Sequence, residues 1–229
     1  MKLCIYCSTG QCIKKGVRNN KQRFQCKSCG KYQLKYYTYK LYNKLDDKII
    51  MFLNAESVGI SSLSRFLGYS KQTILKRITF LASRVSKPRL YEYNQVYEVD
   101  EMWTYVSSCR TRDVRWITYA MNRKTNQIVD VAVGARSKEN LAKVINKLKL
   151  LSPKKIITDK LSVYPNLIIP VEHDTRRYKN NKIERSNLNL RTHIKRLSRK
   201  TICYSKSEKM LENCVLLYFS WHNWQMKFE

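Results

Sequence analysis

The apolar and polar positions of this chain follow three successive patterns, which divide it into three parts. Up to residue 40, the stretches QCIKKGVR and QRFQC flank the turn-forming residues Asn19, Asn20 and Lys21, and this pattern predicts a β-hairpin. Between residues 41 and 86 the apolar positions recur at helical spacing instead. From Tyr97 onward, stretches rich in β-branched and aromatic residues predict strands.

The helical part is interrupted in a way that is typical of a helix-turn-helix. A first helix is predicted in KLDDKIIMFLNAESVG, where Gly59 can end it. In the following SSLSRFLGYSKQTILKRITFLASRV, either Ser61 or Ser62 can cap a short helix. Gly68 then supplies a tight turn and Ser70 can cap a longer helix. The order of helix, turn and helix indicates a DNA-binding domain over residues 41–86.

The third part has the element order of the ribonuclease H-like fold. Residues 87–95 have no apolar period and are expected to be a linker. Strands are then predicted in YEVDEMWTYV, VRWITYAMNR and QIVDVAVGAR, followed by a helix in KENLAKVINKLKLL and a fourth strand in KKIITD. The apolar residues of that helix form one stripe, which consists of Leu141, Val144, Ile145, Leu148 and Leu151. In the ribonuclease H-like order the first strand pairs with the fourth in parallel. We therefore expect an α/β fold in which residues 96–229 form a ribonuclease H-like domain, with a mixed sheet, helices and a C-terminal closing helix.

The charge of the chain points to nucleic acid as its partner. Lys and Arg number 45 against 17 Asp and Glu, which gives a formal net charge of +28. Such a charge opposes compaction unless a polyanion neutralises it. Hydrophobic residues nevertheless make up 43% of the chain, as a folded core requires. No stretch approaches the roughly 18 consecutive apolar residues of a membrane span, so we expect a cytoplasmic, nucleoid-associated protein that does not bind membranes.

Four of the eight cysteines have the spacing of a structural zinc site. Cys4 and Cys7 form one Cys-x-x-Cys pair and Cys26 and Cys29 form another, with 18 residues between the pairs. Two such pairs offer four thiolates to one tetrahedral zinc ion. We therefore predict one structural Zn²⁺ and a zinc ribbon over residues 1–40. Cys12 lies outside this pattern and is expected to be a free cysteine in a strand.

Basic residues around the hairpin and in the second helix of the helix-turn-helix are the candidates for DNA contact. Residues 1–40 contain ten Lys or Arg and no acid, so a surface that contacts phosphates is expected there. In a helix-turn-helix the N-terminal residues of the second helix face the bases. The candidates are Lys14, Lys15, Arg18, Lys21 and Arg23 in the hairpin, and Lys71, Gln72, Thr73, Lys76 and Arg77 in the helix.

Three carboxylates are predicted to meet at the sheet. Asp100 lies on the first strand and Asp159 at the end of the adjacent fourth strand. Two neighbouring carboxylates repel each other unless a cation lies between them, so a divalent metal site is expected rather than a solvated strand end. A third ligand, Glu184, falls in the first turn of a helix that Asn180 or Asn181 can cap. Two metal ions held by such a set promote in-line displacement at phosphorus.

The identity of the first ligand stays open on spacing alone. Glu101 adjoins Asp100 but points to the opposite face of the sheet, and Glu98 shares the face of Asp100.

Three strings of residues carry a resemblance to a known family. EVDEMWTYV, ITDKLSVYP and KIERSNLNLRTHIKRLSRKT resemble the Asp-Asp-Glu transposases of the insertion sequence one family, and with the ribbon and the helix-turn-helix the resemblance covers nearly the whole chain. It implies that Asp100, Asp159 and Glu184 are the catalytic triad, with the basic residue Arg191 seven positions after the glutamate. It further implies two Mg²⁺ per active site, replaceable by Mn²⁺, and cleavage and strand transfer at terminal inverted repeats.

A transposase must hold two DNA ends together, so at least a dimer on DNA is expected. Two other functions remain open from the sequence. One is a DNA-binding regulator whose C-terminal domain only forms oligomers, and the other is a structure-selective nuclease of the same fold.

Overall fold

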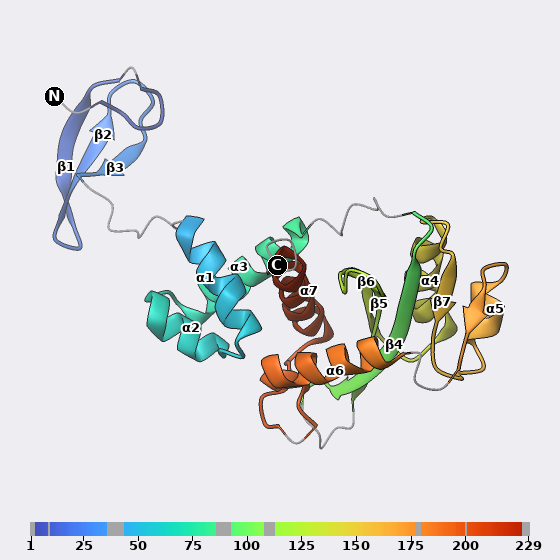
Figure 1. Ribbon diagram of the computed structural model, residues 1–229. Coiled ribbons are helices and arrows are strands. Elements are labelled where there is room, and N and C mark those ends of the chain that lie inside the picture. Colours follow the sequence, from blue (N-terminus) through green and yellow to red (C-terminus); the bar gives the residue numbers. More distant parts are fainter. Residues whose placement is uncertain are drawn as a thin grey trace. The chain divides into compact units, whose positions relative to one another are not determined.

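The computed structural model describes residues 3–8, 10–35, 44–85, 93–107, 113–176, 180–199 and 201–225. The chain forms two compact units, Met1–Asn43 and Lys44–Glu229 (Figure 1). The expected boundary between ribbon and helices, at residues 40 and 41, lies outside the described residues.

The first unit contains the predicted hairpin. Strands β1 (Cys12–Arg18), β2 (Lys21–Cys26) and β3 (Tyr32–Leu34) form an antiparallel sheet in that order. Asn19 and Asn20 connect β1 to β2 with φ values of 48° and 56°. Asn tolerates this left-handed conformation, which a two-residue hairpin turn requires. The hairpin is therefore confirmed, although Lys21 begins β2 and is not part of the turn.

The second unit begins with three helices, α1 (Lys44–Ala55), α2 (Ile60–Leu67) and α3 (Lys71–Arg84). Gly68 ends α2 in the left-handed conformation, and the Ser70 hydroxyl accepts the Thr73 N–H at 3.1 Å, as predicted for a cap. The prediction for the start of α2 was wrong. Gly59 is the N-cap residue and Ser61 and Ser62 lie inside the helix, because an extended Gly59 supplies the first carbonyl without a side-chain cap.

A five-stranded mixed sheet follows, made of β4 (Val96–Tyr105), β5 (Val114–Asn122), β6 (Ile128–Gly134), β7 (Lys155–Ile157) and β8 (His173–Asp174). The strand order is β6-β5-β4-β7-β8, in which β4, β5 and β6 are antiparallel neighbours. β7 pairs in parallel with β4 and with β8. This order confirms the ribonuclease H-like fold. β7 is shorter than predicted, so Asp159 lies two residues beyond its end.

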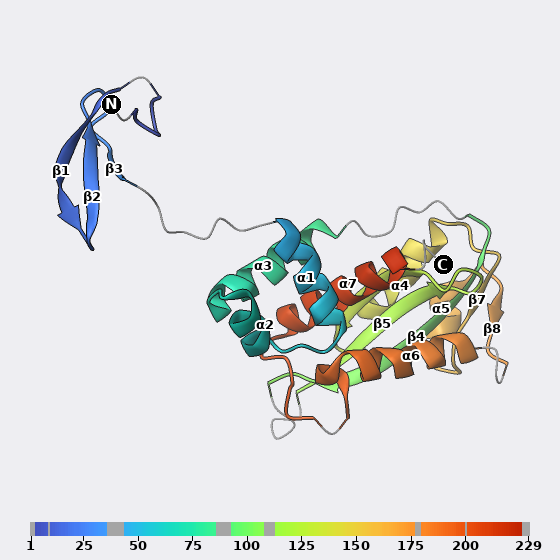
Figure 2. The ribbon, with the colours of Figure 1, turned by 60° about the vertical axis from the view of Figure 1, so that its left-hand side comes forward.

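Helices cover both faces of this sheet, and a separate apolar core lies under each face (Figure 2). α4 (Lys138–Lys149) and α5 (Tyr164–Ile168) pack on one face. α6 (Asn181–His193), the short helix η1 (Lys195–Leu197) and α7 (Glu208–Gln225) pack on the other. The apolar stripe predicted for α4 is fully buried and consists of Leu141, Val144, Ile145, Leu148 and, just beyond the helix, Leu151.

α1 and α3 pack on α7, and α2 packs on α1 and α3, so these helices belong to the same compact unit as the sheet. The Asn54 amide donates to the Cys214 carbonyl at 3.0 Å, and the ring centroids of Phe52 and Trp221 lie 5.6 Å apart. α7 can contact both the sheet and the helices because its buried residues occupy more than one side, including Leu211, Cys214, Val215, Leu217, Tyr218 and Phe219.

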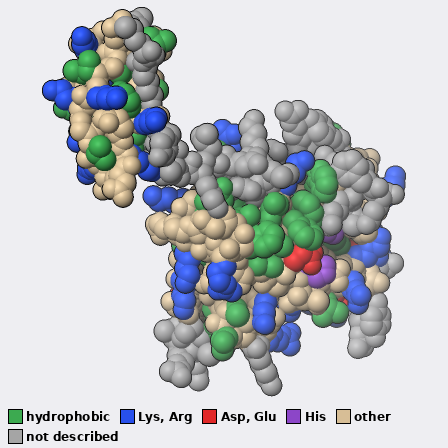
Figure 3. Space-filling view, turned by 90° about the vertical axis from the view of Figure 1, so that its left-hand side faces the viewer, with side chains coloured by type: hydrophobic (Ala, Val, Ile, Leu, Met, Phe, Trp, Pro, Cys, Tyr) green, Lys and Arg blue, Asp and Glu red, His purple; other side chains and the backbone are tan. Residues whose placement is uncertain are grey.

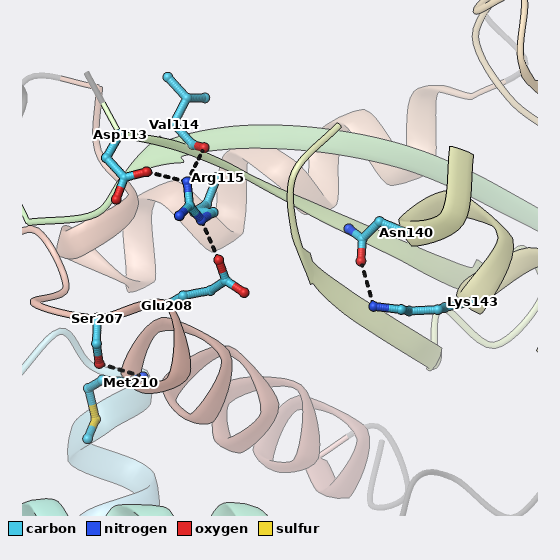
Figure 4. Close-up of polar contacts among 8 residues, drawn as sticks. All are labelled: Asp113, Val114, Arg115, Asn140, Lys143, Ser207, Glu208 and Met210. Carbon is cyan, nitrogen blue, oxygen red and sulfur yellow. Dashed lines mark hydrogen bonds and ion pairs between the residues drawn. The ribbon is translucent and has the colours of Figure 1, made fainter. Parts of the chain in front are cut away.

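The start of α7 is tied to the sheet by polar contacts (Figure 4). Arg115 on β5 pairs with Asp113 and with Glu208, the first residue of α7. Ser207 accepts the Met210 N–H at 3.3 Å and so satisfies one of the free donors of the first turn. Most of the predicted linker, namely residues 87–92, lies outside the described residues. Within the described parts of the chain, no helix is long and apolar enough to cross a bilayer.

Candidate active site and metal sites

Three carboxylates gather where β4 runs past the end of β7. Carboxylate oxygens of Asp100, Glu101 and Asp159 all lie within 4.8 Å of one another. Asp100 and Asp159 were predicted to meet because parallel pairing of β4 with β7 brings the two strands to the same edge. Glu101 was expected to point away, and its presence in this group is a feature that spacing did not reveal.

The two oxygens of Asp100 are each held by a protein donor. The N–H of Glu101 donates to Oδ1 at 2.8 Å, and the side-chain amide of Asn187 donates to Oδ2 at 2.6 Å. Each carboxylate oxygen has two lone pairs, so both oxygens retain the capacity to bind a cation.

Glu101 faces the other side of the sheet, as the alternation of a strand requires. Its carboxylate accepts the Tyr164 hydroxyl at 2.9 Å and lies 3.5 Å from the Arg136 guanidinium. Because Glu101 lies beyond the last residue of β4 that pairs with β7, its side chain borders the loop that carries Asp159. Its carboxylate therefore reaches that of Asp159 from the face opposite to Asp100.

Asp159 lies in the loop after β7. Its Oδ1 accepts the N–H of Leu161 at 3.0 Å, which fixes one oxygen within the loop. The hydroxyl of the preceding Thr158 contacts the Asp159 carbonyl at 2.7 Å and the His173 ring at 2.8 Å. The loop that presents Asp159 is thus tied to β8.

Glu184 is placed in the first turn of α6, as predicted, and Asn180 is the N-cap residue without a side-chain cap. The Glu184 side chain is exposed, and Glu184 is not a member of the group of acids described above. The residue of α6 that contacts this group is Asn187, one turn further along, through Asp100.

Arg191 does not contact the acids in this structure. Its guanidinium donates to the carbonyl of Leu197 at 2.7 Å and to that of Trp103 at 3.2 Å. Arg191 therefore connects α6 to η1 and to the end of β4. Burial lowers the pKa of this guanidinium, although an arginine stays charged at any ordinary pH.

The crowding of the acids changes their protonation. Burial, and then the charges of Glu101 and Asp159, raise the pKa of Asp100 to about 7. Burial and the Asp159 charge raise the pKa of Glu101 as well. Ionised together, the acids repel each other, and a divalent cation with oxygen ligands relieves that repulsion. The donor set therefore fits Mg²⁺ or Mn²⁺, which prefer carboxylate oxygens.

The four predicted zinc ligands come together in the ribbon. The sulfurs of Cys4, Cys7, Cys26 and Cys29 lie within 4.8 Å of one another, and the pairs Cys4–Cys29 and Cys7–Cys26 are each 3.6 Å apart. The N–H of Cys29 lowers the pKa of the Cys26 thiol, which favours the thiolate that a metal binds. Four sulfurs in this arrangement fit a tetrahedral zinc ion.

Gly10 lies against one of the four sulfurs, and the sequence pattern gave no indication of its role. A Cβ atom at this position would lie 2.3 Å from Cys26 Sγ and 2.9 Å from Ser28 Oγ. The close approach of the Gly10 backbone to the sulfur therefore requires glycine.

The candidate DNA-contacting residues differ in how free their side chains are. Seven of them are exposed, and several basic side chains are visible on the N-terminal unit in Figure 3, among uncharged ones. The exposed candidates are Lys14, Lys15, Arg18, Lys71, Gln72, Thr73 and Lys76. Arg77 is instead half-buried, because its guanidinium pairs with both oxygens of Asp47 on α1. Lys21 and Arg23 are half-buried, and Arg23 lies over the Tyr32 ring at 4.4 Å.

Comparison with known proteins places these sites in context. The family described as IS1 transposase matches residues 95–225. Insertion element iso-IS1n protein InsB of Shigella dysenteriae is 33% identical over 127 residues, which are 56% of this chain and 95% of that protein. Insertion element IS1 4 protein InsB of Escherichia coli (strain K12) is 32% identical over 131 residues, 56% of this chain and 75% of that protein.

Among solved structures, the HTLV-2 integrase catalytic core domain in complex with magnesium aligns with a TM-score of 0.31 at 15% identity, over 43% of this chain and 68% of that one. The simian T-cell lymphotropic virus intasome in complex with the PP2A regulatory subunit B56 gamma aligns with a TM-score of 0.33 at 14% identity, over 62% of this chain and 57% of that one.

Proposed function

The chain belongs to the IS1 transposase family, and from that premise we propose that its acids at the β4–β7 edge bind the divalent metal ions for cleaving and joining DNA. The protein is a DNA transposase. The finer proposal is that Asp100, Asp159 and Glu184 are the metal ligands and that the ions are two Mg²⁺, which Mn²⁺ can replace. The observation that carries it is the meeting of Asp100 and Asp159 within 4.8 Å at the end of a parallel strand pair.

The chain's own residues would contribute by orienting the carboxylates. Glu101 N–H and Asn187 fix the Asp100 carboxylate, and Leu161 N–H fixes that of Asp159. Preorganised ligands of this kind pay no reorganisation cost during the reaction. When bound, the divalent ions activate a water or a DNA 3′-hydroxyl and neutralise charge on the leaving oxygen.

Glu184 enters this proposal through its position on α6. It lies three residues before Asn187, and residues at that spacing are neighbours on a helix surface. Its exposed carboxylate is therefore available on the turn next to the one that contacts Asp100. Glu101 is the competing candidate for the third ligand, because it already lies beside both aspartates.

Recognition of the terminal inverted repeats is proposed for the N-terminal half. The ribbon offers exposed cations, with Zn²⁺ as its structural ion, and α3 offers exposed polar residues in its first turns. Lys14, Lys15, Arg18 and Arg23 would contact phosphates, and Lys71, Gln72, Thr73 and Lys76 would face the bases, with Arg77 held by Asp47 behind them. We further propose at least a dimer on DNA and a cytoplasmic location at the nucleoid, where both inverted repeats and target DNA are reached.

The experiment is strand transfer of labelled DNA that carries the sequences flanking the reading frame, into supercoiled plasmid, with Mg²⁺. Wild type should join the DNA, whereas Asp159→Asn should bind it with unchanged affinity and fail to cleave or join. Glu172→Gln is a matched control, because this acid is exposed, pairs with Lys155 and lies outside the group. Loss of joining in the control as well would reject the proposed role of Asp159.

The third ligand is decided by Glu184→Gln and Glu101→Gln in the same assay. The proposal expects Glu184→Gln to abolish cleavage and Glu101→Gln to retain it in part. The reverse result would assign the third ligand to Glu101.

Arg191 remains proposed as the basic residue that supports catalysis. Its guanidinium donates to the Trp103 carbonyl and so connects α6 to β4.

A further inference from the structure

Asp100, Tyr119 and Asn187 form a chain of side-chain contacts between the sheet and α6. Asp100 and Tyr119 are direct cross-strand partners on β4 and β5, and both face α6. Asn187 lies over this pair, donates to Asp100 Oδ2 at 2.6 Å, and accepts from the Tyr119 hydroxyl at 2.9 Å. No motif in the sequence analysis assigned a role to either Tyr119 or Asn187.

The ionised Asp100 carboxylate can only accept hydrogen bonds, which favours one orientation of the Asn187 amide, with its NH₂ group toward Asp100 and its oxygen toward Tyr119. The Tyr119 side chain is fully buried, and burial raises the pKa of its hydroxyl well above the ordinary value, so it keeps its proton. Its hydroxyl has two acceptors on α6, the Asn187 amide oxygen at 2.9 Å and the Ile183 carbonyl at 3.2 Å. A hydrogen bond from a neutral donor to a carboxylate is strengthened by that charge.

A second contact fixes the start of the same helix. The N–H of Ile183, in the first turn of α6, donates to Oε2 of Glu98 at 2.8 Å, and Glu98 is fully buried and paired with Arg123. Glu98 and Asp100 lie two positions apart on one face of β4. They therefore bind α6 at two points one turn apart, and Glu184 lies between those points.

We propose that Asn187 is a positioning residue for the metal site, oriented by Tyr119, and that it sets both the direction of the Asp100 carboxylate and the placement of Glu184. This inference rests on the proposed function of Asp100. Without the Asn187 amide, Asp100 Oδ2 would lose its donor, the Glu101 N–H alone would orient the carboxylate, and the contact of α6 with Asp100 would be lost. Groups that orient metal ligands affect metal affinity because a mobile ligand must be ordered when the ion binds.

The test uses the full-length protein and measures Mn²⁺ binding directly, from the loss of the free-ion signal in electron paramagnetic resonance. Asn187→Ala should weaken Mn²⁺ binding by about tenfold or more. Asn189→Ala is a matched control, since Asn189 is an exposed residue of the same type on the same helix. Thermal unfolding without metal checks that both variants are folded.

A double-mutant cycle separates orientation from general packing. Tyr119→Phe removes the hydroxyl, which also contacts the Ile183 carbonyl at 3.2 Å, and it should weaken Mn²⁺ binding more in the wild-type background than in the Asn187→Ala background. The metal concentration for half-maximal cleavage should move with the binding constant, while DNA affinity stays unchanged.

Two results would overturn the proposal. One is Mn²⁺ affinity of Asn187→Ala within twofold of the Asn189→Ala control, and the other is an equal effect of Tyr119→Phe in both backgrounds. Asp100→Asn and Asp159→Asn serve as reference variants. If they bind Mn²⁺ as tightly as wild type, the proposed metal site itself fails; if they lose binding and Asn187→Ala does not, only the positioning role fails.

Discussion

Asp100 and Glu101 are consecutive residues that point to opposite faces of one sheet, yet their carboxylate oxygens lie within 4.8 Å of each other. The sheet normally separates two such side chains. Here both lie where β4 runs past β7, and the Asp159 carboxylate lies within 4.8 Å of each of them. The site is therefore built at an edge, where acids from both faces meet.

The raised pKa of Asp100 predicts how stability depends on pH when metal is absent. The pKa rises from an ordinary value of 3.8 to about 7 in the folded protein, so the folded state holds this proton more tightly than the unfolded chain. The resulting stabilisation is complete below about pH 4 and is lost as the pH rises to about 7. In EDTA at pH 7.5, Asp100→Asn should therefore be more stable than wild type by about 1 to 3 kcal/mol.

Denaturant unfolding at pH 4 and pH 7.5 measures the difference in stability between wild type and Asp100→Asn. This difference should be small at pH 4. Addition of Mg²⁺ should stabilise wild type and leave Asp100→Asn unchanged. Equal stability of the two proteins in EDTA at pH 7.5 would contradict the raised pKa of Asp100, which burial and the neighbouring charges cause.

Gly10 predicts a sensitive position in the ribbon. Gly10→Ala would place a methyl group 2.3 Å from the sulfur of Cys26, so that ligand must move. Zinc affinity, measured by competition with a chromogenic chelator, should fall by about tenfold or more. Cys203→Ser is the control, because Cys203 is exposed and lies outside the four-sulfur group, so this variant should keep one zinc at wild-type affinity.

On α3 we expect Arg77 to contribute to stability and Lys76 to contribute to DNA binding. The Arg77 guanidinium is bound by Asp47, so Arg77→Ala should lower the free energy of unfolding by about 1 to 3 kcal/mol. Lys76 is exposed, and Lys76→Ala should change stability by less than about 0.5 kcal/mol while weakening DNA binding and its dependence on salt. A Lys76→Ala protein that binds DNA like wild type would remove this helix face from the interface.

Even the conservative change of Arg191 to lysine is expected to lower the stability of the protein. Lysine cannot reproduce the two divergent bonds to the carbonyls of Leu197 and Trp103, so Arg191→Lys should cost about 1 to 3 kcal/mol. Arg185→Lys, at an exposed position of the same helix, should be neutral in the same unfolding experiment. Wild-type stability of Arg191→Lys combined with lost strand transfer would show that Arg191 acts on DNA instead.

The sequence by itself determined the elements and much of the chemistry. Apolar periodicity located the strands β4 to β6 and the buried stripe of α4, because burial of one face imposes a period of two or 3.6 residues. Cysteine spacing located the four thiols, because each pair lies in one tight turn. The parallel pairing of β4 with β7 followed from the element order, and it brought Asp100 to Asp159.

The tertiary structure alone decided the relationships that carry no periodic signal. The packing of α1 and α3 on α7 depends on side chains far apart in the chain, as do the contacts of Asn187 with Tyr119 and Asp100. Strand alternation placed Glu101 on the correct face but did not reveal that its carboxylate lies near those of Asp100 and Asp159, because alternation describes the faces of a sheet and not its edges. The local pattern of apolar and polar residues indicates which face a side chain occupies. Which side chains meet depends on where neighbouring elements end, and that is set by the tertiary structure.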